Sequence, residues 1–152
     1  MTEATHRRRV AVRRRSRVLG LVFLGGTVGT ALRAALEGVA PASAHAMPWT
    51  TLVINVVGSF ALGLLLEVLV RTGIDSGWRR SVRLGLGTGV LGGFTTYSTF
   101  AVETVERLTL EAHLIGLAYA AISVILGVAA AAAGYRWAHQ IGRPAAGQTA
   151  RG

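Results

Sequence analysis

The stretch GGFTTYSTF, residues 92–100, places two glycines, four hydroxyl side chains and three aromatic rings inside an apolar run. That run extends from Leu84 to Val102 and contains no charged residue. Backbone that leaves the helical conformation is tolerated at membrane depth only where protein buries it or water reaches it. We therefore expect a membrane helix that breaks near Gly92–Thr95, and we expect the hydroxyls and rings to serve a function.

The composition of the whole chain indicates a membrane protein. Of its 152 residues, 51% are hydrophobic and only 15% are charged, against about 25% charged residues in ordinary globular domains. Cysteine is absent, which excludes disulfides and thiolate metal sites. The carboxylates are scattered and the histidines lack ligand spacing, so we expect no enzyme. The net charge of +9 comes from arginines that flank apolar runs, so we expect no nucleic-acid partner.

Four apolar segments predict an all-α, multi-pass protein of the cell (plasma) membrane. Each segment reaches the roughly 18 apolar residues that span a bilayer core. Small residues at helical spacing in the first two segments indicate closely packed helices. Four spans enclose little of a pathway alone, so we expect an oligomer. The expected organisation is an Arg-rich cytoplasmic tail (1–17), a membrane domain (18–138) with spans at about 18–40, 49–70, 84–102 and 114–135, and a C-terminal tail (139–152).

Two polar residues within the spans are functional candidates, because polar groups are costly in a bilayer. Arg33 either extends its guanidinium to the far interface or acts inside the protein. Asn55 either forms an interhelical hydrogen bond or contacts a ligand through its amide. Residue spacing alone leaves both pairs of alternatives open.

The 92–100 stretch has the chemistry to handle small ions. A broken helix frees carbonyl oxygens that can coordinate a cation. The threonine and serine hydroxyls can donate hydrogen bonds, and the positive ring edges of Tyr97 and Phe100 can face an anion. Such a lining suits a small, hard anion, because donors replace its hydration shell without a fixed charge to trap it. The alternative is that the hydroxyls bond to their own helix and the rings only pack.

Three segments together resemble the signatures of the Fluc/CrcB fluoride channel family: GGTVGTALR (25–33), TLVINVVGSFALG (51–63) and GVLGGFTTYSTFAVET (89–104). The resemblance implies a four-helix subunit in an antiparallel dimer. Such a dimer exports fluoride passively from the cytoplasm and so lowers its toxicity. It also implies a structural sodium ion, which is not transported.

The resemblance assigns roles to individual residues. It places the sodium on the backbone carbonyls of Gly92 and Thr95. It gives an anion pathway of Asn55, Tyr97, Ser98, Thr99, Phe100, Tyr119 and Ser123, with Arg33 and Glu103 as supporting polar residues. Tyr97 stands where the family usually has phenylalanine. The polar track of the fourth span is shortened, because Gly127 and Ala131 follow Ser123 in it.

The distribution of arginines predicts one orientation in the membrane. Both termini share a side with the loop between the second and third spans, and that side carries fourteen of the sixteen arginines. The positive-inside rule therefore predicts cytoplasmic termini. An antiparallel dimer then requires either an oppositely oriented homologue or a homodimer in which the tail does not fix the orientation.

Two other functions compete with a channel. A proton-coupled exporter of small ions or drugs needs an ionisable residue at membrane depth, yet Glu67 and Glu103 both lie near span ends. A non-transporting membrane scaffold would use the glycines and hydroxyls only for packing. Fluoride efflux from vesicles separates the three functions.

Overall fold

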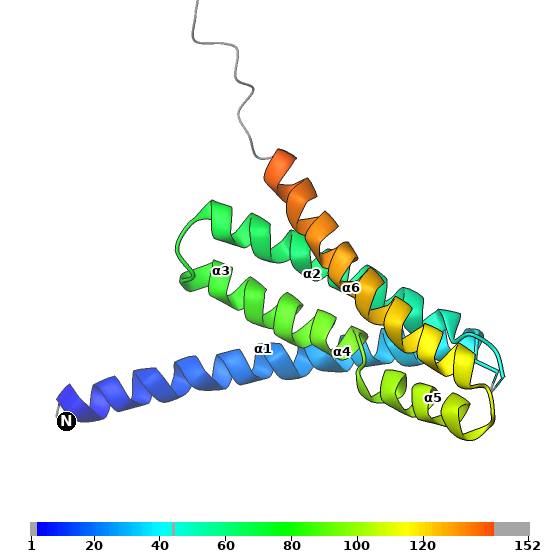
Figure 1. Cartoon of the computed structure of the whole chain (residues 1–152). Helices are drawn as coiled ribbons and strands as arrows, with labels where there is room; N and C mark the ends of the chain where they lie inside the picture. Colours follow the sequence, from blue (N-terminus) through cyan, green and yellow to red (C-terminus); the bar gives the residue numbers. More distant parts are fainter. Residues whose placement is uncertain (1–2, 44, 142–152) are drawn as a thin grey trace, which may run out of the picture.

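The computed structural model describes residues 3–43 and 45–141, with side chains from residue 15 onward. The regular elements among these residues are all helices, without a strand, which confirms the predicted fold class. Figure 1 shows the elements in order. They are α1 (Glu3–Val39), α2 (Trp49–Thr72), α3 (Gly77–Val82), the π-helix η1 (Arg83–Leu91), α4 (Gly92–Phe94), α5 (Ser98–Thr109) and α6 (His113–Ile141).

The described residues form four helical passes, as expected for a four-helix membrane protein. Residues 15–39 of α1, the whole of α2 and the whole of α6 are long and apolar enough to cross a bilayer. The remaining pass is bent: α3, η1 and α4 form one arm, and α5 forms the other (Figure 1). Helix α1 runs without interruption through the predicted tail boundary at residue 17. The Arg-rich start and the apolar span thus belong to one helix.

The predicted break in the third pass is confirmed, and it lies at the end of the predicted interval. Helix α4 ends at Phe94, Thr95 is extended with ψ 156°, and the helix resumes at Ser98. Gly92 is helical with φ −66° and ψ −32°, so the glycines do not themselves break the helix. A Cβ at Gly93 would lie 2.5 Å from the Gly26 carbonyl oxygen, so this glycine permits close packing instead.

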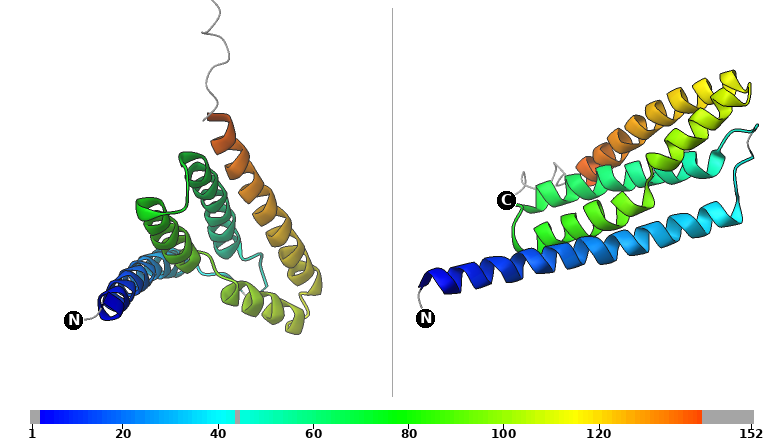
Figure 2. Two further views of the ribbon diagram at one scale, coloured as in Figure 1. Left: turned by 90° about the vertical axis from the view of Figure 1, so that its left-hand side faces the viewer. Right: turned by 90° about the horizontal axis from the view of Figure 1, so that it is seen from below.

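Small residues bring the helices together in two pairs, as the sequence predicted. Figure 2 shows α1 beside the arm of α3, η1 and α4, and α2 beside α6. A Cβ at Gly29 of α1 would overlap the Val90 carbonyl oxygen of η1. Likewise, a Cβ at Gly63 of α2 would lie 3.1 Å from the Cα of Ala131 in α6. Backbone contact this close needs glycine, and it provides packing energy in lipid.

A buried arginine fixes the connection between α1 and α2. Arg107 of α5 is 1% exposed. Its guanidinium donates to the carbonyl oxygens of Ser43 (2.8 Å), Ala46 (2.7 Å) and Glu103 (2.7 Å). The charge-assisted hydrogen bonds to Ser43 and Ala46 hold the loop against α5, and the one to Glu103 lies within α5 itself.

Candidate functional site

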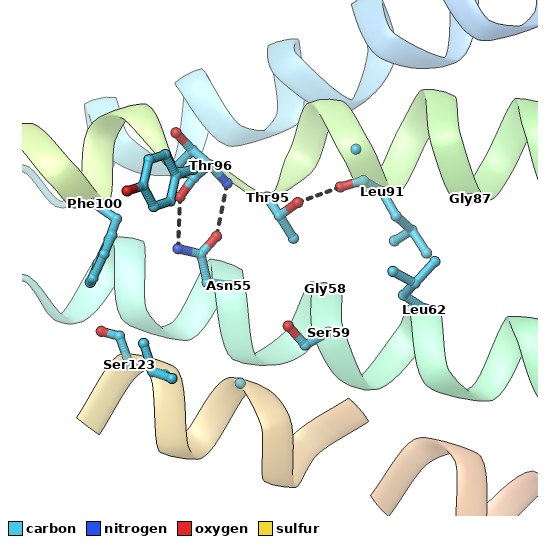
Figure 3. Close-up of a pocket in the computed structure, with 14 residues that line it drawn as sticks. Asn55, Gly58, Ser59, Leu62, Gly87, Leu91, Thr95, Thr96, Phe100 and Ser123 are labelled. Carbon is cyan, nitrogen blue, oxygen red and sulfur yellow. Dashed lines mark hydrogen bonds between the residues drawn. The ribbon is translucent and has the colours of Figure 1, made fainter. Parts of the chain in front are cut away.

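A groove of about 330 Å³ opens beside the break, between α2, the bent pass and α6 (Figure 3). It brings together six of the predicted site residues: Asn55, Gly92, Thr95, Tyr97, Phe100 and Ser123. The rest of the lining is Gly58, Ser59, Leu62, Gly87, Leu91, Thr96, Val124 and Gly127. Among the described residues, no charged one lines this groove, so the polar character of its described lining comes from neutral groups alone.

Asn55 holds the break open from the neighbouring helix. Its Nδ2 donates to the Thr96 carbonyl oxygen at 3.0 Å, and the Thr96 N–H donates to its Oδ1 at 2.8 Å (Figure 3). This amide pair replaces the backbone partners that Thr96 loses outside a helix. The predicted interhelical hydrogen bond is therefore present. Because Asn55 also lines the groove and Nδ2 carries a second hydrogen, contact with a ligand remains compatible with it.

The break redirects the two amides that would otherwise serve the Gly92 and Thr95 carbonyls. In a continuous helix each carbonyl accepts from the amide four residues later. The Thr96 N–H donates to Asn55 Oδ1 instead, and the Thr99 N–H donates to Thr96 Oγ1 at 3.1 Å. The two carbonyls assigned to a cation therefore lose their regular helical partners.

The remaining hydroxyls of the stretch interact mainly with one another. Thr96 Oγ1 donates to Thr99 Oγ1 at 3.0 Å and lies 3.2 Å from Ser98 Oγ. Thr95 Oγ1 donates to the Leu91 carbonyl oxygen at 2.9 Å. Ser98 and Thr99 lie at the start of α5, outside the groove lining. The alternative of local hydrogen bonding thus holds for part of the stretch.

Three aromatic rings form a tilted row at one end of the groove. The centroids of Tyr97 and Phe100 are 6.0 Å apart at an interplanar angle of 44°. Those of Phe100 and Tyr119 are 5.3 Å apart at 50°. Tilted rings present edges to their surroundings, and ring edges carry positive partial charge. Phe100 lies in the middle of the row and Tyr97 is 81% exposed, so the row reaches from the protein interior to its surface.

Ser123 provides the most informative atom of the site. Its hydroxyl is buried and, within the described residues, has no hydrogen-bond partner. It lines the groove from α6, as Figure 3 shows. A buried hydroxyl without a partner is costly, and native structures rarely contain one without a reason. A ligand that accepts a hydrogen bond inside the groove would supply that reason.

Comparison with known proteins identifies the family. The family described as "CrcB-like protein, Camphor Resistance (CrcB)" matches residues 20–135. The chain belongs to the CrcB family. A relative in Cutibacterium acnes, named fluoride-specific ion channel FluC 1, is 51% identical over 75% of this chain and 80% of its own length. FluC 2 of Leifsonia xyli is 51% identical over 80% and 83%. FluC of Deinococcus radiodurans is 49% identical over 73% and 86%.

Behind the groove, the CrcB chain carries a polar cluster around Glu103. The Tyr119 hydroxyl donates to Glu103 Oε2 at 2.7 Å, and the Thr51 hydroxyl donates to Oε1 at 2.9 Å. Tyr119 is fully buried and lies outside the groove lining, although its ring contacts Phe100. The hydrogen bond from Tyr119 to Glu103 therefore fixes the ring of Tyr119, which in turn packs against Phe100.

Arg33 acts inside the CrcB fold. Its Nε donates to the Gly93 carbonyl oxygen at 3.3 Å, and its Nη1 lies 3.1 Å from Glu37 Oε2. Thr30 also donates to the same carbonyl, at 3.4 Å. Of the two alternatives for Arg33, the structure therefore favours the role within the protein, where it supports α4 just before the break.

Sequence reasoning missed several lining residues of this CrcB groove, and Ser59 is the most important among them. Ser59 lies one helical turn after Asn55 on α2, a spacing that places both on one face. That spacing was the available signal. Gly58 was assigned to packing, and a Cβ there would overlap the methyl group of Thr95. Within the residues that the structure describes, no three His, Asp or Glu side chains gather as a metal site.

Proposed function

We propose that this CrcB chain is a channel subunit that lets fluoride leave the cytoplasm passively, which lowers its toxicity. The family is one of channels rather than enzymes, and the relatives are named fluoride-specific ion channels. The observation that carries the proposal is the unpartnered Ser123 hydroxyl, which faces a groove shared with the Asn55 amide and the Phe100 ring.

The groove suits fluoride for a physical reason. Fluoride is small and strongly hydrated, so a pathway must offer hydrogen-bond donors at each step. The hydroxyl, the amide N–H and the ring edges offer donors or positive partial charge. Because none of the described side chains that line the groove is charged, the lining places no fixed charge that would retain the anion. Binding is then strong enough for entry and weak enough for release.

Efflux from vesicles tests this function. The purified protein is placed in vesicles loaded with potassium fluoride, and an ionophore carries the compensating potassium. A channel gives fast fluoride release that needs the ionophore and no proton gradient. Release that requires a proton gradient would identify the proton-coupled exporter. Vesicles that release no fluoride would identify the non-transporting scaffold and contradict the proposal.

A second subunit completes the pathway in this proposal. The aromatic row ends at Tyr97, whose side chain is exposed on the surface of one subunit. An antiparallel partner would cover this side of the groove and exclude lipid from it. Tyr97→Cys should therefore form a disulfide-linked or linker-bridged dimer in membranes. Cys introduced at Phe23, which is exposed on α1 outside the groove lining, is the control that should not do so.

A structural sodium ion at the carbonyls of Gly92 and Thr95 belongs to the same proposal. One observation supports it: both carbonyls lose their helical amide partners. Bound sodium would supply positive charge between the broken helices of the two subunits and hold them together. Replacing sodium by a large organic cation should lower activity and dimer stability, and indifference to that replacement would contradict the site.

The arginine distribution supports termini in the cytoplasm and an oppositely oriented homologue as partner. Two arginines lie on the opposite side, and both are engaged within the protein: Arg107 with loop carbonyls, and Arg33 with Glu37 and Gly93. The bias toward one orientation is therefore stronger than the count of charges suggests. C-terminal reporters that signal from opposite sides of the membrane test this. Equal signals, with robust flux from the chain expressed alone, would establish a homodimer instead.

A further inference from the structure

Helices α2 and α6 run side by side in the same direction (Figures 1 and 2). Their polar residues come in pairs along the two helices. At the end away from the termini, Thr51 of α2 and Tyr119 of α6 share Glu103. One turn further, Asn55 and Ser123 line the groove together. Residues of α2 and α6 therefore lie opposite each other in pairs, one pair for each helical turn.

The next turn pairs Ser59 with Gly127. A Cβ built at Gly127 would lie 3.7 Å from Ser59 Oγ, so the serine occupies the space beside the glycine. At this height α6 has no side chain to offer, and the hydroxyl comes from α2. One turn beyond, Gly63 and Ala131 bring the two backbones into contact, which closes the space between these helices.

We propose that Ser59 is the last hydroxyl donor of the anion pathway on the side of the termini, replacing the hydroxyl that α6 lacks at residue 127. This inference rests on the proposed function. The shortened track of α6 is thus completed from α2, and a fluoride ion passes from Ser123 to Ser59.

The surroundings of Ser59 fit a donor to an anion. Its side chain lines the groove, as Figure 3 shows. Among the described residues, no hydrogen bond occupies its hydroxyl. A free serine hydroxyl can turn its proton toward an incoming anion. Ser59 lies one turn from Asn55, while Ser123 lies one turn from Gly127. An anion leaving Ser123 therefore meets the next donor on the opposite helix.

Four variants in the vesicle efflux assay test this role. Ser59→Ala should lower the fluoride rate about tenfold or more, as expected for losing a hydrogen bond to a charged group. Ser59→Thr retains the hydroxyl and should stay close to wild type. Adding Gly127→Ser to Ser59→Ala should restore most of the rate, because it moves the hydroxyl to the facing helix. Ser81→Ala, outside the groove on α3, is the control and should transport normally.

The outcomes separate the inference from the function on which it rests. Wild-type vesicles that release no fluoride would refute the proposed function. Normal wild-type release with an unchanged Ser59→Ala rate would refute only the role of Ser59. A Ser59→Ala loss that Gly127→Ser fails to restore, with Ser59→Thr equally slow, would assign Ser59 to helix packing and overturn the inference. Size-exclusion elution of each variant at the wild-type position confirms that folded protein is compared.

Discussion

Replacing Asn55 by aspartate tests the anion pathway with almost no change in shape. The wild-type amide accepts from the Thr96 N–H at 2.8 Å and donates to the Thr96 carbonyl oxygen at 3.0 Å. Aspartate retains the first hydrogen bond. In place of the hydrogen bond to the Thr96 carbonyl, a carboxylate oxygen then faces that carbonyl oxygen. The break loses one of its two hydrogen bonds to Asn55 of α2.

The size of the effect follows from this geometry. Loss of the donor should cost about 1–3 kcal/mol of folding stability, since it leaves a partly buried carbonyl without its partner. An ionised carboxylate about 4 Å from a fluoride ion would raise the energy of the anion by about 4 kcal/mol at an effective dielectric constant near 20. That energy corresponds to a roughly thousandfold slower passage.

The assay compares fluoride efflux and thermal unfolding of Asn55→Asp with those of Gln140→Glu. Gln140 is exposed near the end of α6, so this control makes the same chemical change away from the groove. We expect Asn55→Asp to remain folded, with a lower unfolding temperature, and to lose measurable flux. An Asn55→Asp rate equal to that of the control would remove Asn55 from the pathway and refute the reasoning.

Three further predictions concern single features. Phe100→Ile should lower fluoride flux by at least about tenfold, because an aliphatic side chain has no positive edge; Phe23→Ile on the exposed face of α1 should not, and equal rates would exclude the ring. Gly93→Ala should destabilise the fold by about 1–3 kcal/mol through overlap with Gly26, whereas Gly92→Ala should leave the unfolding temperature nearly unchanged; the reverse order would contradict the assignment. Arg83 holds the pKa of Asp75 below its usual 3.8 through a hydrogen bond, so this pair stabilises the fold above that pH and ceases to as pH falls through the lowered pKa; Asp75→Asn should therefore lower the unfolding temperature at neutral pH and match wild type in strong acid.

The sequence predicted the helical passes well, because apolar length is a local property. It also placed the break within three residues, since hydroxyls in an apolar run conflict with a lipid-facing helix. It assigned the break to Gly92 and Gly93, however, because glycine permits both a broken helix and a close helix contact. Only the approach of Gly26 to Gly93 decides between these two uses, and that contact joins residues far apart in the chain.

The composition of the site was less predictable, for the same reason. The spacing from Asn55 to Ser123 in the sequence says nothing of their meeting in one groove. Arg107 was only a charge in the count of arginines, yet it is buried and bound to loop carbonyls. Ser59 lies four residues after Asn55, so the sequence already places both on one face of α2. The proposed role of Ser59, however, follows from its position beside Gly127 of the facing helix, which the sequence does not show.

The most direct test of passive fluoride conduction is the voltage at which current through the protein reverses. Purified protein in a bilayer is exposed to a fluoride gradient, with chloride gradients and pH set independently on the two sides. Passive conduction through a groove selective for fluoride predicts that the reversal voltage equals the equilibrium potential of fluoride and is unaffected by pH or chloride. A reversal voltage that follows the proton gradient or the chloride gradient would contradict it.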